Sequence, residues 1–124
     1  MKLTNNEIYT MANMIQPIAH STTIQLPIKA NFFLQKNAKM LAAAAKEIDE
    51  ARVEIGKRYG EYDKNTSMYN IPNEKMEDAS KALEELFNIE QELDVKKIKI
   101  EDLGDASFTP AQMQVLMFMI DDED

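Results

Sequence analysis

The sequence has no cysteine, one histidine and only three glycines in 124 residues. Without cysteine there are no disulfides, no thiolate metal ligands and no cysteine nucleophile, and a cytoplasmic location is the simplest interpretation. The three glycines are isolated, so they cannot form a glycine-rich phosphate-binding loop. His20 has no partner at metal-ligand spacing and is interpreted as an ordinary loop residue. We therefore predict that the protein is not an enzyme and uses no metal or cofactor.

Basic residues are also in the minority. Fourteen lysines and arginines stand against 22 acids, which gives a formal net charge of −8. Because general nucleic-acid binding depends on neutralising phosphates, direct nucleic-acid binding is not expected. No apolar run approaches the ~20 residues of a membrane span, so no membrane association is expected either. The composition is 44% hydrophobic and 29% charged, which is typical of a globular protein, and the length predicts a single domain over residues 1–124.

The acids are concentrated in two stretches. Eight acids and two lysines occur between residues 74 and 94, and the chain ends in four acids at 121–124. Such stretches are usually solvated helix faces and solubilising ends. The alternative is that an acidic surface containing Glu84 and Glu85 meets a basic partner, in the manner of a nucleic-acid backbone.

Hydrophobic periodicity predicts a long antiparallel helical hairpin over residues 28–93. A heptad pattern of apolar residues extends through its first helix at Leu34, Leu41, Ile48 and Ile55 and continues to Tyr62. Gly60 marks the end of this helix. Arg52 interrupts this seam and is expected either to snorkel to the surface or to pair with an acid of the returning helix such as Glu84 or Glu85. A shorter first helix is predicted from a Thr4–Glu7 capping box; it should end or kink near Pro17, and His20 begins a connection.

Two β-branched stretches, residues 22–26 and 94–100, predict short strands. Each is continuous with one helix of the hairpin, so we expect them to lie side by side and antiparallel at its base. The two terminal helices would cover this ribbon and complete a head formed by residues 1–27 and 94–124. The predicted fold class is therefore mainly α with a small β ribbon (α+β).

The last helix is unusually apolar. Thr109, Pro110 and Gln112 predict its start, and residues 113–120 are hydrophobic except for Gln114. One face, formed by Met113, Leu116, Met117 and Ile120, can cover the ribbon. This leaves three flanking residues without an obvious cover: Val115, Phe118 and Met119. Two interpretations stay open, an ordinary core or an interface with a partner or a second copy.

Two other charged clusters are weaker candidates. Glu101, Asp102 and Asp105 could hold a hard cation, but they lack the spacing of a calcium loop and a solvated turn is favoured. Lys96, Lys97 and Lys99 favour an edge strand protected from aggregation, with a basic contact patch as the alternative.

Several segments resemble an uncharacterised family of small proteins from phages and prophages of Gram-positive bacteria, over nearly the whole chain: residues 1–8 (MKLTNNEI), 26–29 (LPIK), 34–37 (LQKN), 50–61 (EARVEIGKRYGE), 86–93 (LFNIEQEL) and 97–103 (KIKIEDL). The resemblance implies expression in the cytoplasm of a host bacterium and assigns no catalytic residue.

A non-enzymatic protein of this kind is expected to bind another protein. It would serve either as an accessory factor or chaperone in virion assembly, or as an inhibitor of a host defence effector. The alternatives are an acidic nucleic-acid mimic directed against host defence, as anti-CRISPR proteins are, and, ranked last, an oligomer that sequesters a ligand.

Overall fold

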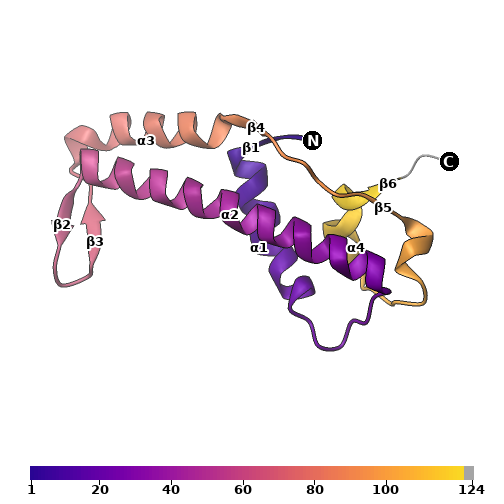
Figure 1. Ribbon diagram of the computed structural model, residues 1–124. Helices are drawn as coiled ribbons and strands as arrows, with labels where there is room; N and C mark the ends of the chain where they lie inside the picture. The colour runs from indigo at the N-terminus through magenta and orange to yellow at the C-terminus, as the bar shows by residue number, and fades with distance from the viewer. Residues whose placement is uncertain (122–124) are drawn as a thin grey trace.

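The computed structural model describes residues 1–121 and has an α+β fold that is mainly helical, as predicted (Figure 1). Its elements are, in chain order, β1 (Lys2–Thr4), α1 (Asn5–Ala19), α2 (Ile28–Tyr59), β2 (Glu61–Asp63), β3 (Met68–Asn70), α3 (Asn73–Asn88), β4 (Glu90–Glu92), β5 (Ile98–Lys99), the 3₁₀ helix η1 (Ile100–Leu103), α4 (Pro110–Leu116), the 3₁₀ helix η2 (Met117–Met119) and β6 (Ile120–Asp121). Asp122–Asp124, which complete the acidic end noted in the sequence, lie outside the described residues.

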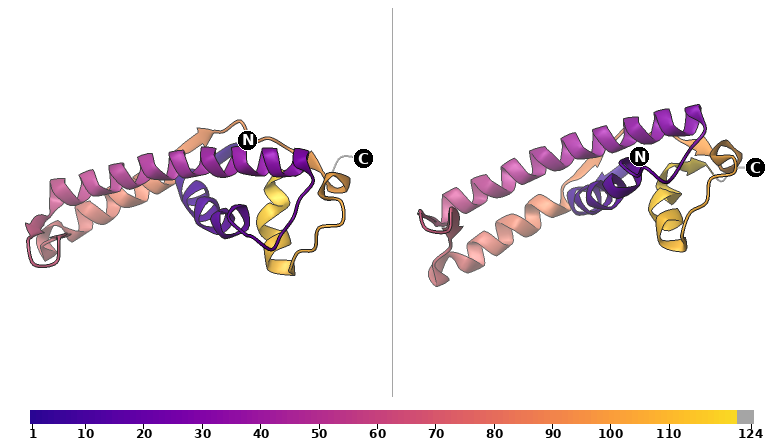
Figure 2. Two further views of the ribbon diagram at one scale, coloured as in Figure 1. Left: turned by 60° about the horizontal axis from the view of Figure 1, so that its bottom comes forward. Right: turned by 90° about the horizontal axis from the view of Figure 1, so that it is seen from below.

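The 32-residue helix α2 organises the fold. Figures 1 and 2 show α3 running back along the half of α2 that ends at Tyr59, while α1 and α4 lie at the half that begins at Ile28. A helical hairpin is therefore present, but α3 covers only half of α2.

Burial along α2 follows this division. Leu34, Leu41 and Ile48 of the predicted seam are buried, whereas Ile55 is half-buried. Tyr62 is 54% exposed and belongs to β2, so the heptad pattern does not continue that far as helix. Ala79 is the one buried residue of α3. The core thus lies around α1, and few residues are buried at the end of α2 near Tyr59. We call residues 49–59 of α2, together with β2, β3 and α3, the distal arm.

Helix α1 begins as the sequence predicted. The Thr4 side chain accepts a hydrogen bond from the Glu7 N–H, and the Glu7 carboxylate accepts one from the Thr4 N–H. Helix α1 ends at Ala19, two residues after Pro17, and His20 begins the connection as predicted. Pro17 is exposed and lies in the last turn, where its missing N–H removes a single bond, while the extra turn buries Ile18.

The strand predicted over residues 22–26 is absent. The segment is an irregular connection in which the Ser21 hydroxyl accepts the N–H groups of Thr23 and Ile24 at 3.2 and 3.3 Å. Residues 23–26 alternate between exposed and half-buried, as in a strand, but no neighbouring strand pairs with them. The alternating pattern indicates which side chains face the core. It does not indicate whether the backbone is hydrogen-bonded to another strand.

The other predicted strand is present only in part. Of residues 94–100, Ile98 and Lys99 form β5, and they pair in parallel with β6. The predicted antiparallel ribbon instead involves β1 and β4, with Leu3 opposite Gln91. Helix α3 ends at Asn88, so residues 90–92, expected to be helical, form β4.

Two buried asparagines join these segments to the helices. Asn5 donates to the Leu86 carbonyl at 2.9 Å and accepts from the Gln91 amide at 2.6 Å. Asn37, which is 1% exposed, accepts the Lys96 N–H and donates to the Lys96 carbonyl, both at 2.8 Å. Asn5 thus binds the last turn of α3, and Asn37 satisfies the backbone groups of Lys96, which belongs to no strand.

Candidate protein-binding surfaces

The candidate metal and catalytic residues are not assembled into a site. No group of three His, Asp or Glu side chains within residues 1–121 could hold a metal ion. Asp102 Oδ2 accepts the Lys99 N–H at 2.9 Å and lies 3.4 Å from Lys29 Nζ; the backbone hydrogen bond, with the nearby lysine, holds the pKa of Asp102 below its usual value. His20 Nε2 lies 3.0 Å from Gln16 Oε1 at the end of α1.

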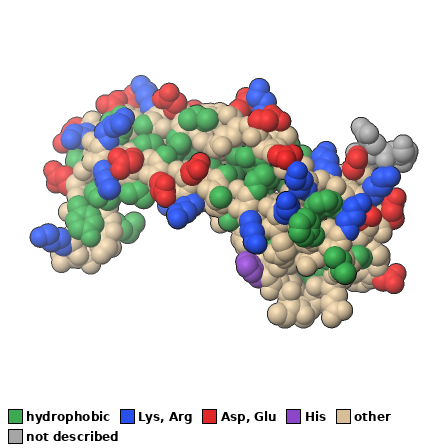
Figure 3. Space-filling model, in the orientation of Figure 1, with side chains coloured by type: hydrophobic (Ala, Val, Ile, Leu, Met, Phe, Trp, Pro, Cys, Tyr) green, Lys and Arg blue, Asp and Glu red, His purple; other side chains and the backbone are tan. Residues whose placement is uncertain are grey.

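An open groove of about 430 Å³ lies on the distal arm. Two of its apolar side chains are markedly exposed, Val53 at 44% and Met68 at 66%. Figure 3 shows hydrophobic side chains reaching the surface along the arm and over the β2–β3 end. The groove is lined from α2, β3 and α3 by Arg52, Val53, Ile55, Gly56, Ser67, Met68, Tyr69, Ile71 and Leu83.

The β2–β3 hairpin forms one end of this groove, and sequence reasoning missed it. Tyr62 and Tyr69 are opposite each other in the ladder, with ring centroids 5.3 Å apart. Gly60 leads directly into β2, where an added Cβ would lie 2.7 Å from the Gly56 carbonyl oxygen, so the sharp exit from α2 requires glycine. The signal available was a polar turn at 63–67 between two tyrosine-containing stretches.

The acidic candidates Glu84 and Glu85 are both exposed on α3. Helical periodicity places Glu84, together with Glu77, on the side of α3 next to the groove residue Leu83. Glu85 lies on the outer side, away from α2, with Glu74 and Asp78. The acids therefore follow two faces of α3, one beside the groove and one facing solvent.

Arg52 does not pair with Glu84 or Glu85 as predicted. Its Nη2 atom lies 3.2 Å from Asp49 Oδ1, one turn earlier on the same helix, and its side chain is 53% exposed. An i,i+3 partner on the same helix is reached without crossing to α3. Arg52 thus lies in the groove with its charge compensated locally.

The C-terminal helix is not the exposed interface that its apolar sequence suggested. Met119 is 1% exposed and belongs to the core, and Val115 and Phe118 are half-buried against it. Met117, expected to face the core, is 59% exposed. Met119 follows the buried Leu116 by three residues, which puts both on one side of the 3₁₀ helix, whereas Met117 is turned away from that side.

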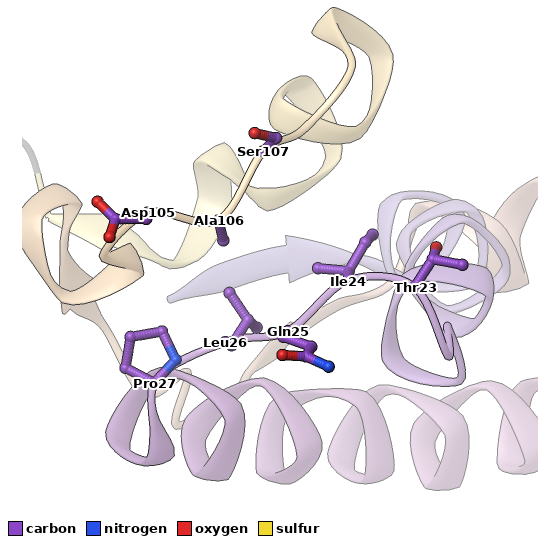
Figure 4. A pocket seen from close by; sticks show the side chains of 8 residues that line it. All are labelled: Thr23, Ile24, Gln25, Leu26, Pro27, Asp105, Ala106 and Ser107. Atoms are coloured by element: carbon purple, nitrogen blue, oxygen red, sulfur yellow. The ribbon is translucent and has the colours of Figure 1, made fainter.

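A second opening, of about 560 Å³, separates the connection before α2 from the one before α4. Figure 4 shows Ile24 and Leu26 facing Ala106 across it, with Gln25 and Asp105 among the other lining residues. At one end the two connections meet, since an added Cβ on Gly104 would lie 3.0 Å from Pro27. The opening is wide and contains no cluster of ionisable groups that would select a ligand.

Comparison of the chain with protein-family models, curated proteins and solved structures finds no match. None of the helices in residues 1–121 combines the length and apolar character needed to cross a membrane.

Proposed function

We propose that this protein is non-enzymatic and works by binding another protein through the groove of the distal arm. The observation that carries the proposal is the exposed apolar lining of that groove, outside the main core, at Val53 and Met68. Exposed apolar side chains gathered in one groove are typical of a binding surface.

The chemistry of the groove favours one kind of occupant, a basic amphipathic helix. Apolar side chains of such a helix would fill the groove, and its lysines or arginines would meet Glu84 on the adjoining side of α3, since Glu77 already pairs with Lys81 at 3.4 Å. Arg52 lies in the groove but does not repel a basic helix, because Asp49 already compensates the charge of Arg52. Acidic groups beside an apolar groove select basic helices mainly by accelerating the encounter and rejecting acidic competitors.

The resemblance to phage and prophage proteins supports two settings for this binding in a host cytoplasm. In the first, the protein is an assembly factor or chaperone that holds a basic segment of a virion protein. In the second, it inhibits a host defence effector, and the acids of α3 occupy a surface that the effector uses for nucleic acid. The second setting is favoured by the eight acids between residues 74 and 94.

A designed pair of peptides tests the groove directly. An 18-residue amphipathic helix of leucine and lysine should bind, and the same helix of leucine and glutamate should not, as measured by fluorescence anisotropy. Exchanging both Val53→Ser and Met68→Gln should weaken binding of the Leu–Lys peptide about tenfold, or ~1.4 kcal/mol. The matched control, Met14→Gln with Met117→Gln, changes two methionines that are 50% and 59% exposed but lie outside the groove. Equal binding by the two double variants would reject the groove as the site.

A further inference from the structure

The connection before α2 has a strand-like sequence but no strand partner. Its β-branched pattern at residues 22–26 predicted a strand, and residues 24–27 form neither a helix nor a turn. Within residues 1–121, the backbone N–H and carbonyl groups of Gln25 and Leu26 form no hydrogen bond. This segment therefore presents backbone donors and acceptors that the described chain does not use.

The connection before α4 has the same character. Residues 106–109 also form neither a helix nor a turn, and exposed and half-buried residues alternate over 105–109 as they do over 23–27. The backbone groups of Ser107 and Phe108 are likewise without hydrogen bonds in the part of the chain that the structure describes. The two connections form opposite walls of the opening of about 560 Å³ (Figure 4). Two segments with unused backbone groups thus border one opening.

Both walls are fixed to the rest of the molecule. Ile24 and Leu26 are half-buried and pack against the core. At the end where the two connections meet, Lys29 Nζ lies 3.4 Å from Asp102 Oδ2, which joins the start of α2 to η1. A ligand that enters the opening does not have to order these segments first, and this lowers the entropic cost of binding.

The connection before α2 lacks most of the features that keep a strand edge from pairing. Residues 21–27 contain no charged side chain, and their one proline, Pro27, is at the end. In contrast, exposed lysines at 97 and 99 flank the buried Ile98 of the short strand β5. Exposed edges are usually protected by lysine, proline or a bulge. The edge at residues 23–26 is therefore open to another strand.

We propose that an extended peptide of a partner protein binds in this opening by adding a strand beside residues 23–26. The N–H and carbonyl of one strand residue point to the same edge, so Gln25 offers both groups to a single peptide. Alternate side chains of the peptide contact the apolar residues Ile24, Leu26 and Ala106, which face one another across the opening (Figure 4). In this mode of binding the main chain supplies affinity and the alternate side chains supply specificity.

The lining also indicates the chemistry of the peptide. Ala106 is small, which leaves room for a branched apolar side chain opposite Ile24 and Leu26. Asp105 is the one charged residue among the eight that line the opening, so it favours a basic peptide and disfavours an anionic small molecule. The inference does not rest on the proposed function, because the groove lies on the distal arm and shares no lining residue with this opening.

A single backbone N–H tests the proposal. The probe is a capped fluorescent peptide of about seven residues in which valine and threonine alternate, with a lysine at each end. It should bind the wild type in an anisotropy titration up to about 1 mM. Gln25→Pro removes an N–H that the described chain does not use, so the protein should fold while binding weakens at least about tenfold. Gln25→Ala is the matched control, because it retains the N–H, and it should bind within about twofold of wild type.

A second variant and a modified probe examine the other parts of the site. Ala106→Leu fills the opening from the opposite wall without altering the backbone of residues 23–26, and it should also weaken binding at least about tenfold. Two versions of the peptide are N-methylated at every second amide, one version for each edge. At least one of them should bind about tenfold more weakly, because it cannot donate to the protein.

Hydrogen exchange locates the contact. Saturating peptide should slow exchange of the Gln25 amide at least about tenfold and leave the Val53 amide on the distal arm unchanged. A wild type that does not bind the peptide, or equal binding by Gln25→Pro and Gln25→Ala, would overturn the proposal. So would loss of binding in the Val53→Ser and Met68→Gln variant, which would place the peptide in the groove. Protection of the Gln25 amide by raised protein concentration alone would also overturn it, because a second copy would then cover this edge.

Discussion

The side chain of Asn37 hydrogen-bonds both backbone groups of Lys96, with each bond 2.8 Å long. Asn37 of α2 thereby supplies the hydrogen bonds that a neighbouring strand would otherwise supply, because the segment around Lys96 has no strand partner. Asn37 Nδ2 also lies 3.6 Å from Met119 Sδ, so this one amide connects α2, the segment before β5 and the C-terminal core.

Asn37→Ala should therefore destabilise the protein by about 2–4 kcal/mol, because it leaves the Lys96 N–H and carbonyl without partners in a half-buried position. Asn31→Ala is the control on the same helix. Asn31 is exposed, and its loss should cost no more than about 0.5 kcal/mol in urea unfolding. Equal losses for the two would show that Lys96 finds other partners, such as water.

Stability should fall off along α2 towards the distal arm. Leu41→Ala should cost about 2–5 kcal/mol, because Leu41 is fully buried where α2 packs in the core. Ile55→Ala should cost less than about 2 kcal/mol, because its side chain is half-buried beside the groove. Urea unfolding of both variants measures the two losses of stability. A larger loss for Ile55→Ala than for Leu41→Ala would contradict the finding that few residues of the distal arm are buried.

The C-terminal residues provide a matched pair two positions apart. Met119→Ala should cost about 2–5 kcal/mol, whereas Met117→Ala should cost about 0.5 kcal/mol or less. The opposite order would show that Met117 faces the core and Met119 the solvent. Thermal unfolding of the two variants distinguishes the two arrangements.

Asp102 should make the stability depend on pH. Its pKa is lowered in the folded protein, chiefly by the hydrogen bond from the Lys99 N–H. A carboxyl with a lowered folded pKa stabilises the protein above its unfolded-state pKa, and this contribution is lost as pH falls through the folded pKa. The difference in stability between wild type and Asp102→Asn should therefore be present at neutral pH and vanish in acid. A difference that persists unchanged into acid would show that the charge is irrelevant. A carbon-detected NMR titration of Asp102 measures the pKa directly.

Local signals were sufficient to predict the helices. The capping boxes at Thr4–Glu7 and Thr109–Gln112 both form as expected, and the heptad positions from Leu34 to Ile48 are buried. These features depend on residues a few positions apart, which is the range over which helical periodicity and capping act.

Pairing between distant segments could not be predicted. Nothing around Leu3 indicates that it will lie opposite Gln91. The β-branched residues at 22–26 were a strand signal without a strand partner, and the 3₁₀ turn that buries Met119 leaves no mark in a hydrophobic run. The groove was missed for the same reason, since it is assembled from segments that only the fold brings together.

The central claim is that the distal-arm groove binds a protein partner. Its most direct test is quantitative co-purification from phage-producing cells with tagged wild type, the Val53→Ser and Met68→Gln variant, and the Met14→Gln and Met117→Gln control. The account predicts that one stoichiometric partner accompanies the wild type and the control and is reduced about tenfold with the groove variant; a virion protein would indicate assembly, and a host effector would indicate inhibition. Equal recovery of the partner with all three proteins would contradict the claim.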